Sequence, residues 1–178
     1  MIDMYKYTDK EVKTLLKSMT IIIDSDEKVF DHISDWFDKK KIPYVKKNLD
    51  FCDYSFYLPA NPELGIVRDT YFDKSISIER KRDLNEISSN FCDGRTQFEN
   101  EFIRSTGKVY LLIENATYED IINGNYTTKI TPQSFIGSLH AFVDRYNLTT
   151  QFMKDNRYSA YFIYQTFYYF LRNYLMNK

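Results

Sequence analysis

A glutamate and a lysine stand two positions apart, at Glu79 and Lys81, where the short apolar segment through Ile76 and Ile78 ends. Because side chains alternate along a β-strand, a strand here would place both on the same face of a sheet. Such a pair suits metal-dependent hydrolysis of phosphodiesters. The carboxylate binds a hard cation through oxygen, and the ammonium orients the attacking water or stabilises charge on the phosphate. Alone, the tripeptide is a weak signal, because chains with 28% charged residues contain it by chance.

Further carboxylates accompany the neighbouring apolar segments. Asp24 follows the run from Ile21 to Ile23, Asp53 precedes a segment of alternating character, and Glu114 ends the run from Val109 to Ile113. If these segments share one sheet, their carboxylates can gather at one edge. The pattern therefore predicts a divalent metal site, with Glu114 either supporting that site or simply ending its strand.

The periodicity of apolar residues predicts strands alternating with helices, which is typical of an α/β layer fold. Thr8 and Glu11 form a capping box at the start of a short helix, and Thr131-Pro132 begins a later one. The segments 44–49 and 54–58 are expected to pair with each other as strands. The other expected elements are a strand at 21–24, a helix at 28–41, a loop at 59–70, helices beginning near 84 and continuing near 98, a central parallel strand at 109–113, a strand near 150–153 and a helix from about 158 to 176.

The final helix carries aromatic side chains on more than one face. Tyr161, Tyr164, Phe167, Tyr168 and Leu171 could belong to the core of this chain or to an association surface. We favour a partly intermolecular role, because aromatic residues at other positions of this helix leave little polar face.

Composition limits the class of protein. A chain of 178 residues is expected to form one domain with a substantial core. The formal net charge of −1 argues against coating nucleic acid by bulk charge, although runs such as Lys39-Lys40-Lys41 and Arg80-Lys81-Arg82 could form local basic clusters. The aromatic fraction of 17% favours a core of bulky residues over a base-stacking surface.

The cysteines and histidines indicate neither a zinc site nor a disulfide framework. Cys52 and Cys92 lie far apart in the sequence, which favours reduced thiols and a cytoplasmic location. His32 and His140 fall in expected helices and are interpreted as surface or packing residues. We expect no signal peptide and no membrane span, because no apolar run reaches the necessary length.

The order of residues after Ile76 resembles a known family. Glu79-Arg80-Lys81 is followed by Asp93-Gly94-Arg95 and then by an apolar strand that ends in Glu114. This order resembles the nuclease domain of the XPF-type (ERCC4-domain) structure-specific DNA endonucleases, whose signature is Gly-Asp, a variable gap and Glu-Arg-Lys-x-x-x-Asp. The resemblance covers roughly residues 20 to 154. It implies a restriction-endonuclease-like, PD-(D/E)xK core with a mixed central sheet flanked by helices, a Mg²⁺- or Mn²⁺-dependent site, and hydrolysis of branched or flapped DNA.

The resemblance also implies a role for individual residues. Asp53 and Glu79 would bind the metal, Asp24 would bind it directly or through water, and Lys81 would orient the attacking water. Residues expected to support the site or to bind DNA are Glu27, Arg80, Asn85, Asp93 and Arg95.

The chain departs from the family pattern at three positions. Cys52 replaces the glycine before Asp53, Asp26 stands where the family has arginine, and Asn85 stands where the signature has its last aspartate, with Asp83 close by. Asn85 and Asp26 motivate an alternative function: a weak or inactive module that binds DNA junctions together with a partner subunit. The retained Glu79 and Lys81 favour the active enzyme.

We therefore predict one nuclease domain over 1–178, with an N-terminal helical extension at 1–19, a core at about 20–154 and a C-terminal helix at about 157–178. No tandem helix-hairpin-helix module of the larger relatives is expected. DNA binding would then come from the domain itself, from a homodimer or from a partner subunit. The Lys-, Asn- and Tyr-rich composition suggests a phage or low-GC bacterial origin.

Overall fold

A mixed seven-stranded sheet forms the centre of the protein, for which a computed structural model describes residues 6–176. The strand order is β2-β1-β3-β5-β6-β7, with β4 paired to β3. β1 is parallel to β2 and antiparallel to β3, whereas β5, β6 and β7 are mutually parallel. The strands are β1 (Thr20–Ile23), β2 (Tyr44–Lys46), β3 (Tyr54–Leu58), β4 (Thr70–Tyr71), β5 (Ile76–Lys81), β6 (Lys108–Glu114) and β7 (Leu148–Met153).

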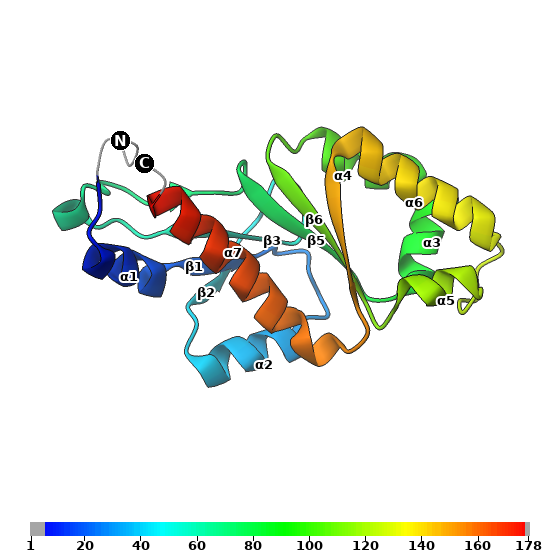
Figure 1. The fold of residues 1–178 in the computed structure, drawn as a ribbon, viewed down its shortest axis with the longest axis horizontal. Helices are drawn as coiled ribbons and strands as arrows, with labels where there is room; N and C mark the ends of the chain where they lie inside the picture. Colours follow the sequence, from blue (N-terminus) through cyan, green and yellow to red (C-terminus); the bar gives the residue numbers. More distant parts are fainter. Residues whose placement is uncertain (1–5, 177–178) are drawn as a thin grey trace.

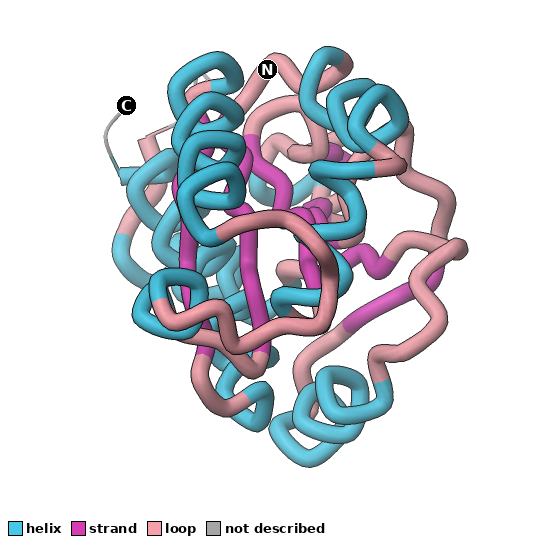
Figure 2. The backbone as a smooth tube through the Cα atoms, turned by 90° about the vertical axis from the view of Figure 1, so that its right-hand side faces the viewer, coloured by secondary structure: helices cyan, strands magenta, loops and turns pink. Residues whose placement is uncertain are grey.

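Helices cover the two faces of this sheet over different strands (Figure 1). On the first face, α1 (Asp9–Ser18), α2 (Asp31–Lys40) and α7 (Ser159–Met176) enclose one hydrophobic core with β1, β3 and β5. On the second face, α3 (Leu84–Cys92), α4 (Arg95–Ile103), α5 (Tyr118–Ile122) and α6 (Pro132–Tyr146) enclose another with β6 and β7. Figure 2 shows the strands held between these helices. The short helices η2 (Pro62–Leu64) and η3 (Asn156–Tyr158) lie in connections.

Local sequence signals account for several of these elements. The predicted capping box is present, because the Thr8 side chain accepts from Glu11 N and the Glu11 carboxylate accepts from Thr8 N. Thr131 likewise caps α6, with Pro132 in its first turn. β6 is apolar almost throughout because Leu111 belongs to the second core and Leu112 to the first, as expected of a central parallel strand.

Three expectations about these elements were wrong. The segments 44–49 and 54–58 do not pair, because β1 lies between β2 and β3. The alternation of Tyr54, Phe56 and Leu58 marked the buried face of β3 correctly, but alternation does not identify the neighbouring strand. The expected helix at 28–41 begins only at Asp31, and the expected loop at 59–70 contains η2 and the first residue of β4.

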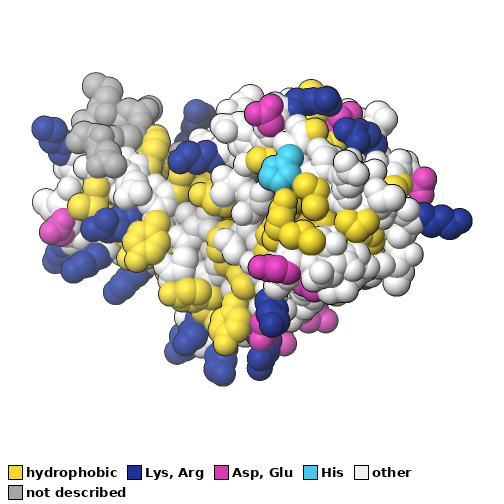
Figure 3. Space-filling model, turned by 45° about the vertical axis from the view of Figure 1, so that its right-hand side comes forward, with side chains coloured by type: hydrophobic (Ala, Val, Ile, Leu, Met, Phe, Trp, Pro, Cys, Tyr) yellow, Lys and Arg dark blue, Asp and Glu magenta, His cyan; other side chains and the backbone are white. Residues whose placement is uncertain are grey.

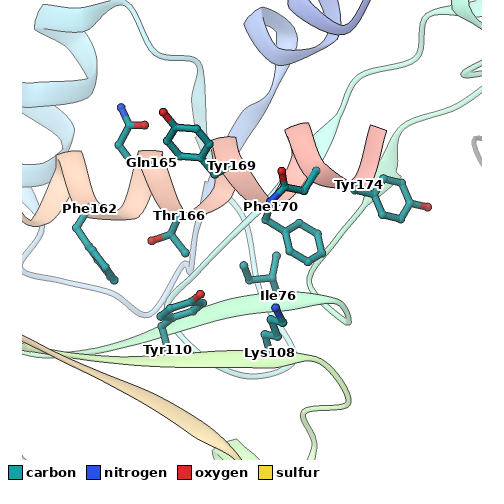
Figure 4. Close-up of a pocket in the computed structure, with 10 residues that line it drawn as sticks. Ile76, Lys108, Tyr110, Phe162, Gln165, Thr166, Tyr169, Phe170 and Tyr174 are labelled. Carbon is teal, nitrogen blue, oxygen red and sulfur yellow. The ribbon is translucent and has the colours of Figure 1, made fainter. Parts of the chain in front are cut away.

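The final helix contributes to the first core through a strip of fully buried residues. Ile163, Phe167 and Leu171 belong to that core, whereas Tyr161 and Tyr169 are exposed. Beside α7, a groove of about 600 Å³ runs along the start of β5 and β6. Phe162 and Phe170 project from α7 toward the sheet there (Figure 4). The intermolecular role of this helix stays a prediction. None of the helices within residues 6–176 could span a membrane.

Position 107 needs a glycine because the backbone just before β6 passes close to Ser75, at the end of the turn that precedes β5. A Cβ atom at Gly107 would lie 2.4 Å from the backbone carbonyl of Ser75. Lys108 N donates to this same carbonyl oxygen at 3.0 Å, so the two segments cannot separate freely. We expect Gly107→Ala to lower the free energy of unfolding by about 1–3 kcal/mol, measured by urea denaturation.

Gly137 provides the matched control for that substitution. It lies within α6, and a Cβ atom there would meet nothing within 4 Å. Gly137→Ala should therefore stabilise the protein by about 0.5–1 kcal/mol, because alanine favours the helix. Equal effects of the two substitutions would contradict the steric explanation.

Candidate active site

Glu79 and Lys81 project from β5 onto the second face of the sheet. Both side chains are buried, and Lys81 Nζ donates a hydrogen bond to Glu79 Oε1 at 2.7 Å. The ammonium also lies 4.8 Å from the centre of the Phe98 ring of α4. The shared face that alternation predicted is thus confirmed.

Asp53 reaches the same place from the segment that leads into β3. Cys52 has a positive φ of 59°, and Asp53 N then donates to Ile78 O at 3.1 Å. In return, the backbone N–H of Arg80 donates to Asp53 Oδ2 at 2.7 Å. Asp53 leads into β3, the antiparallel neighbour of β5. The two hydrogen bonds between these segments therefore hold the Asp53 carboxylate beside Glu79. The left-handed conformation of Cys52 shows why a glycine would suit this position.

These three side chains line one cavity of about 560 Å³. Asp24 and Asp26 line it as well, from the loop after β1. The Asp24 oxygens already accept from Leu49 N at 2.7 Å and Asp26 N at 2.9 Å, so Asp24 also braces its loop.

The opposite wall of the cavity comes from α3 and α4, and the sequence interpretation missed it. The lining side chains there include Asn90, Gln97, Glu101 and Arg104. The helical spacing of Phe98 and Phe102 indicated the buried side of α4, and could have shown that Glu101 lies beside it. Nothing in the sequence indicated that α4 would face Glu79.

Burial and repulsion between carboxylates dominate the electrostatics of the cavity. Burial, reinforced by the charge of Glu79, raises the pKa of Asp53 well above its ordinary value. Burial also raises the pKa of Glu79, although Lys81 opposes the shift. For Lys81, burial lowers the pKa, but the charges of Glu79 and Asp53 outweigh it and the pKa is raised overall. The raised pKa favours the ammonium form of Lys81.

Arg80 points to the other face of β5 and is enclosed by carboxylates. Its guanidinium donates to Glu114 Oε2 at 2.7 Å, to Glu27 Oε1 at 3.0 Å and to Val29 O at 2.8 Å. His32 Nε2 lies 2.9 Å from Glu114 Oε1. Burial raises the pKa of Glu114, but His32 and Arg80 outweigh it and the pKa is lowered overall. Arg80, Glu27 and Glu114 thus form a buried ion network behind the cavity, and His32 has a polar role that the sequence did not reveal.

The family model for the ERCC4 domain matches residues 23–166 of this chain. The chain belongs to the ERCC4 domain family. No curated protein matches the sequence.

The fold of this ERCC4 domain is that of solved XPF structures. XPF from Aeropyrum pernix superposes with a TM-score of 0.56 at 16% sequence identity, over 83% of this chain and 59% of that chain. XPF from Aeropyrum pernix in complex with DNA gives a TM-score of 0.56 and 16% identity, over 85% of this chain and 64% of that chain. The predicted restriction-endonuclease-like α/β fold is confirmed, and the chain spans about three fifths of these proteins.

None of the five predicted supporting residues of the ERCC4 domain lines the cavity. Glu27 and Arg80 belong to the ion network behind it, and the other three lie elsewhere. Asn85 Oδ1 accepts from Thr127 N at 2.7 Å, so this amide holds the loop after α5. Asp93 is exposed at the end of α3, and the Arg95 guanidinium lies 5.1 Å from the Phe142 ring centre. Asp83, two residues before Asn85, caps α3 by accepting from Glu86 N.

The donor set of the cavity fits a hard divalent cation. Within residues 6–176, no group of three or more His, Cys, Asp and Glu side chains is arranged to hold a metal. Mg²⁺ commonly needs only one or two carboxylates, because water and substrate phosphate complete its octahedron. Asp53 and Glu79 supply two such carboxylates. The pKa of Asp53 is raised chiefly by burial and then by the charge of Glu79, and a bound cation would offset both effects.

Proposed function

We propose that this ERCC4 domain is a divalent-metal-dependent DNA endonuclease that hydrolyses phosphodiester bonds at branched, flapped or single-strand/double-strand junctions. The observation that carries the proposal is the convergence of Asp53, Glu79 and Lys81 on one cavity, with Lys81 Nζ 2.7 Å from Glu79 Oε1. Two carboxylates beside a fixed cation match the needs of phosphodiester hydrolysis, in which negative charge builds on the phosphate.

Each residue has a distinct part in this proposal. Asp53 and Glu79 would hold Mg²⁺ or Mn²⁺, and Asp24 would assist from its braced loop. A bound divalent cation supplies Lewis acidity that stabilises charge on the phosphate and lowers the pKa of the attacking water. Lys81, charged and held by Glu79, orients that water and stabilises the phosphate oxygens. Arg80 acts from behind, because its backbone N–H fixes Asp53.

The surface charge is compatible with a DNA substrate despite the net charge of −1. Figure 3 shows Lys and Arg side chains gathered on the half of the molecule toward α1 and α2. Local gathering of cations can bind phosphate, because field strength depends on how charge is distributed. α1 and α2 cover the first face of the sheet, however, and the cavity lies on the second. A homodimer or a partner subunit, through the groove beside α7, would extend the DNA contact.

The alternative is a weak or inactive module that binds DNA junctions with a partner subunit. It is favoured by the lack of a three-donor metal cluster in the described residues and by the extra negative charge of Asp26 at the cavity. A cleavage assay on flap, splayed-arm and single-stranded DNA with Mg²⁺ or Mn²⁺ separates the two functions. Cleavage by the wild type supports the endonuclease. Binding to branched DNA without a nick, in either metal, supports the module.

Metal binding should be visible without any DNA. We expect millimolar Mg²⁺ or Mn²⁺ to raise the melting temperature, with a larger shift at pH 8 than at pH 5.5. The reason is that the raised pKa of Asp53 and Glu79 favours their protonated forms at low pH, and a proton competes with the metal. Above these pKa values the repelling carboxylates destabilise the metal-free fold, and the cation relieves that cost.

Asp53→Asn provides the control for this thermal measurement. The substitution should remove most of the metal-induced shift at both pH values. A shift of the same size in Asp53→Asn, or one that grows as the pH falls, would place the metal elsewhere.

A further inference from the structure

The second face of the sheet is covered only in part by helices. The residues of the second core come from β6, β7, α3 to α6 and the segment at Phe51 and Cys52. Within the described chain, no residue of β1, β2, β3 or β4 belongs to that core. The second-face side chains of β3 and β4 therefore lie outside it, on the same face as the candidate active site.

Two tyrosines form a stack on this part of the face, which the second core does not reach, although Ser55 on the same face of β3 is fully buried. Tyr57 of β3 and Tyr71 of β4 are direct cross-strand partners, with ring centres 5.2 Å apart and planes inclined by 21°. Tyr71 is 43% exposed. Tyr54 and Phe56 belong to the first core, so their side chains lie on the first face. Tyr57 directly follows Phe56 in β3, so its side chain lies on the second face.

A lysine completes this surface. Lys47, which follows β2, extends to the stack and donates from Nζ to the Tyr71 hydroxyl at 2.7 Å, with the ammonium 4.1 Å from the ring centre. The Lys47 ammonium carries three donors, so it can contact a phosphate while it keeps Tyr71. Asp69, the nearby carboxylate, accepts a hydrogen bond from Ala60 N at 2.9 Å.

The surface lies in line with the cavity. Tyr57 follows Asp53 by four residues along an extended segment, which corresponds to about 13 Å at the rise of a strand. About four stacked nucleotides span that length. A strand of DNA whose phosphate lies at Asp53 and Glu79 could thus reach the tyrosines without bending away from the sheet.

We propose that Tyr57, Tyr71 and Lys47 form a platform that binds the single-stranded arm of a branched DNA substrate next to the cleavage site. The proposal rests on the proposed function, whose substrate it specifies. An exposed tyrosine ring stacks on bases of any sequence, and a cation beside it binds the backbone. Tyr71 is the exposed ring here, and the half-buried Tyr57 supports it. A blunt duplex keeps its bases paired and cannot use the platform.

Binding measurements without divalent metal test the platform, because nothing is cut under those conditions. We expect Tyr71→Ala to weaken binding of flap DNA about tenfold by fluorescence anisotropy, with less than a twofold change for a blunt duplex of equal length. Tyr71→Phe keeps the ring and should stay within twofold of the wild type. Lys47→Gln should reduce the slope of log affinity against log salt by about 0.7 on single-stranded DNA.

Matched controls come from exposed residues elsewhere. Tyr158 is 59% exposed in η3, and Lys129 is exposed in the connection between α5 and α6. Tyr158→Ala and Lys129→Gln should leave both affinities unchanged. The platform is refuted if Tyr71→Ala behaves like Tyr158→Ala, or if it weakens the blunt duplex as much as the flap.

The outcome can be separated from the proposed function. A wild type that cleaves DNA, combined with unchanged binding in Tyr71→Ala, refutes the platform alone. Selective loss of flap binding in Tyr71→Ala supports the platform even if the wild type never nicks DNA, which would refute the endonuclease. Thermal unfolding of each variant confirms that only folded protein is compared.

Discussion

Glu79→Gln is expected to slow DNA cleavage about a thousandfold or more while leaving the fold intact. The substitution removes one of the two carboxylate charges proposed to hold the divalent cation. Loss of that stabilisation corresponds to about 4 kcal/mol, and each 1.36 kcal/mol is a factor of ten in rate. The amide has the shape of the carboxylate, and its oxygen can still accept the 2.7 Å hydrogen bond from Lys81 Nζ. Single-turnover cleavage with saturating enzyme measures the effect on chemistry alone.

Two further variants sharpen that measurement. Lys81→Ala should lower the same rate about a hundredfold or more, because it removes the cation that stabilises the phosphate. Glu119→Gln makes the same chemical change at an exposed position of α5 and should leave the rate within twofold. A Glu79→Gln rate within tenfold of the wild type would refute the catalytic assignment of Glu79.

Arg80→Ala is expected to lower the free energy of unfolding by about 3–5 kcal/mol, the cost of breaking a buried ion pair from one side. The side chain of Glu114 is fully buried and accepts from Arg80 at 2.7 Å. Without Arg80, both Glu114 and Glu27 would lose their main counter-charge. Glu114 would keep its contact with His32. Urea denaturation of the wild type and the variant measures the difference.

The pH dependence distinguishes this electrostatic cost from a loss of packing. The lowered pKa of Glu114 means that its ionised form stabilises the fold above its ordinary pKa, and that this contribution fades as the pH falls. In Arg80→Ala the contribution is already gone, so the difference between the two proteins should be smaller below pH 4 than at pH 8.

A neighbouring arginine supplies the control for the stability measurement. The side chain of Arg82 is 58% exposed and lies 3.7 Å from Asp83. Arg82→Ala should cost less than about 1 kcal/mol, as is typical of surface ion pairs. Similar costs for the two arginines, or a deficit of Arg80→Ala that grows at low pH, would argue against the buried network.

Short-range sequence features correctly predicted the structural features that depend on residues close together in the chain. The capping box at Thr8 and the cap at Thr131 depend on residues three positions away, and both were predicted correctly. The shared face of Glu79 and Lys81 follows from the two-residue repeat of a strand, so it needed no knowledge of the neighbours. The order of the Glu-Arg-Lys and Asp-Gly-Arg segments was enough to indicate the family.

The surroundings of the same residues depended on packing between distant segments. Arg80 contacts Glu27 and Glu114, 53 and 34 positions away. Asn85 is directed to Thr127, 42 positions away, although the signature suggested the site. No periodicity encodes such contacts, because they arise only when separate helices and strands pack against one another.

The sequence by itself determined most of the longer helices and strands, the face of β5 that carries the chemistry, and the family to which the chain belongs. Only the tertiary structure decided that β1 separates β2 from β3, that α4 closes the cavity with Glu101 and Arg104, and that Arg80 faces away from it. The physical reason is range. Backbone alternation and helix capping act within a few residues, whereas strand order and buried ion networks minimise the free energy of the whole packed sheet.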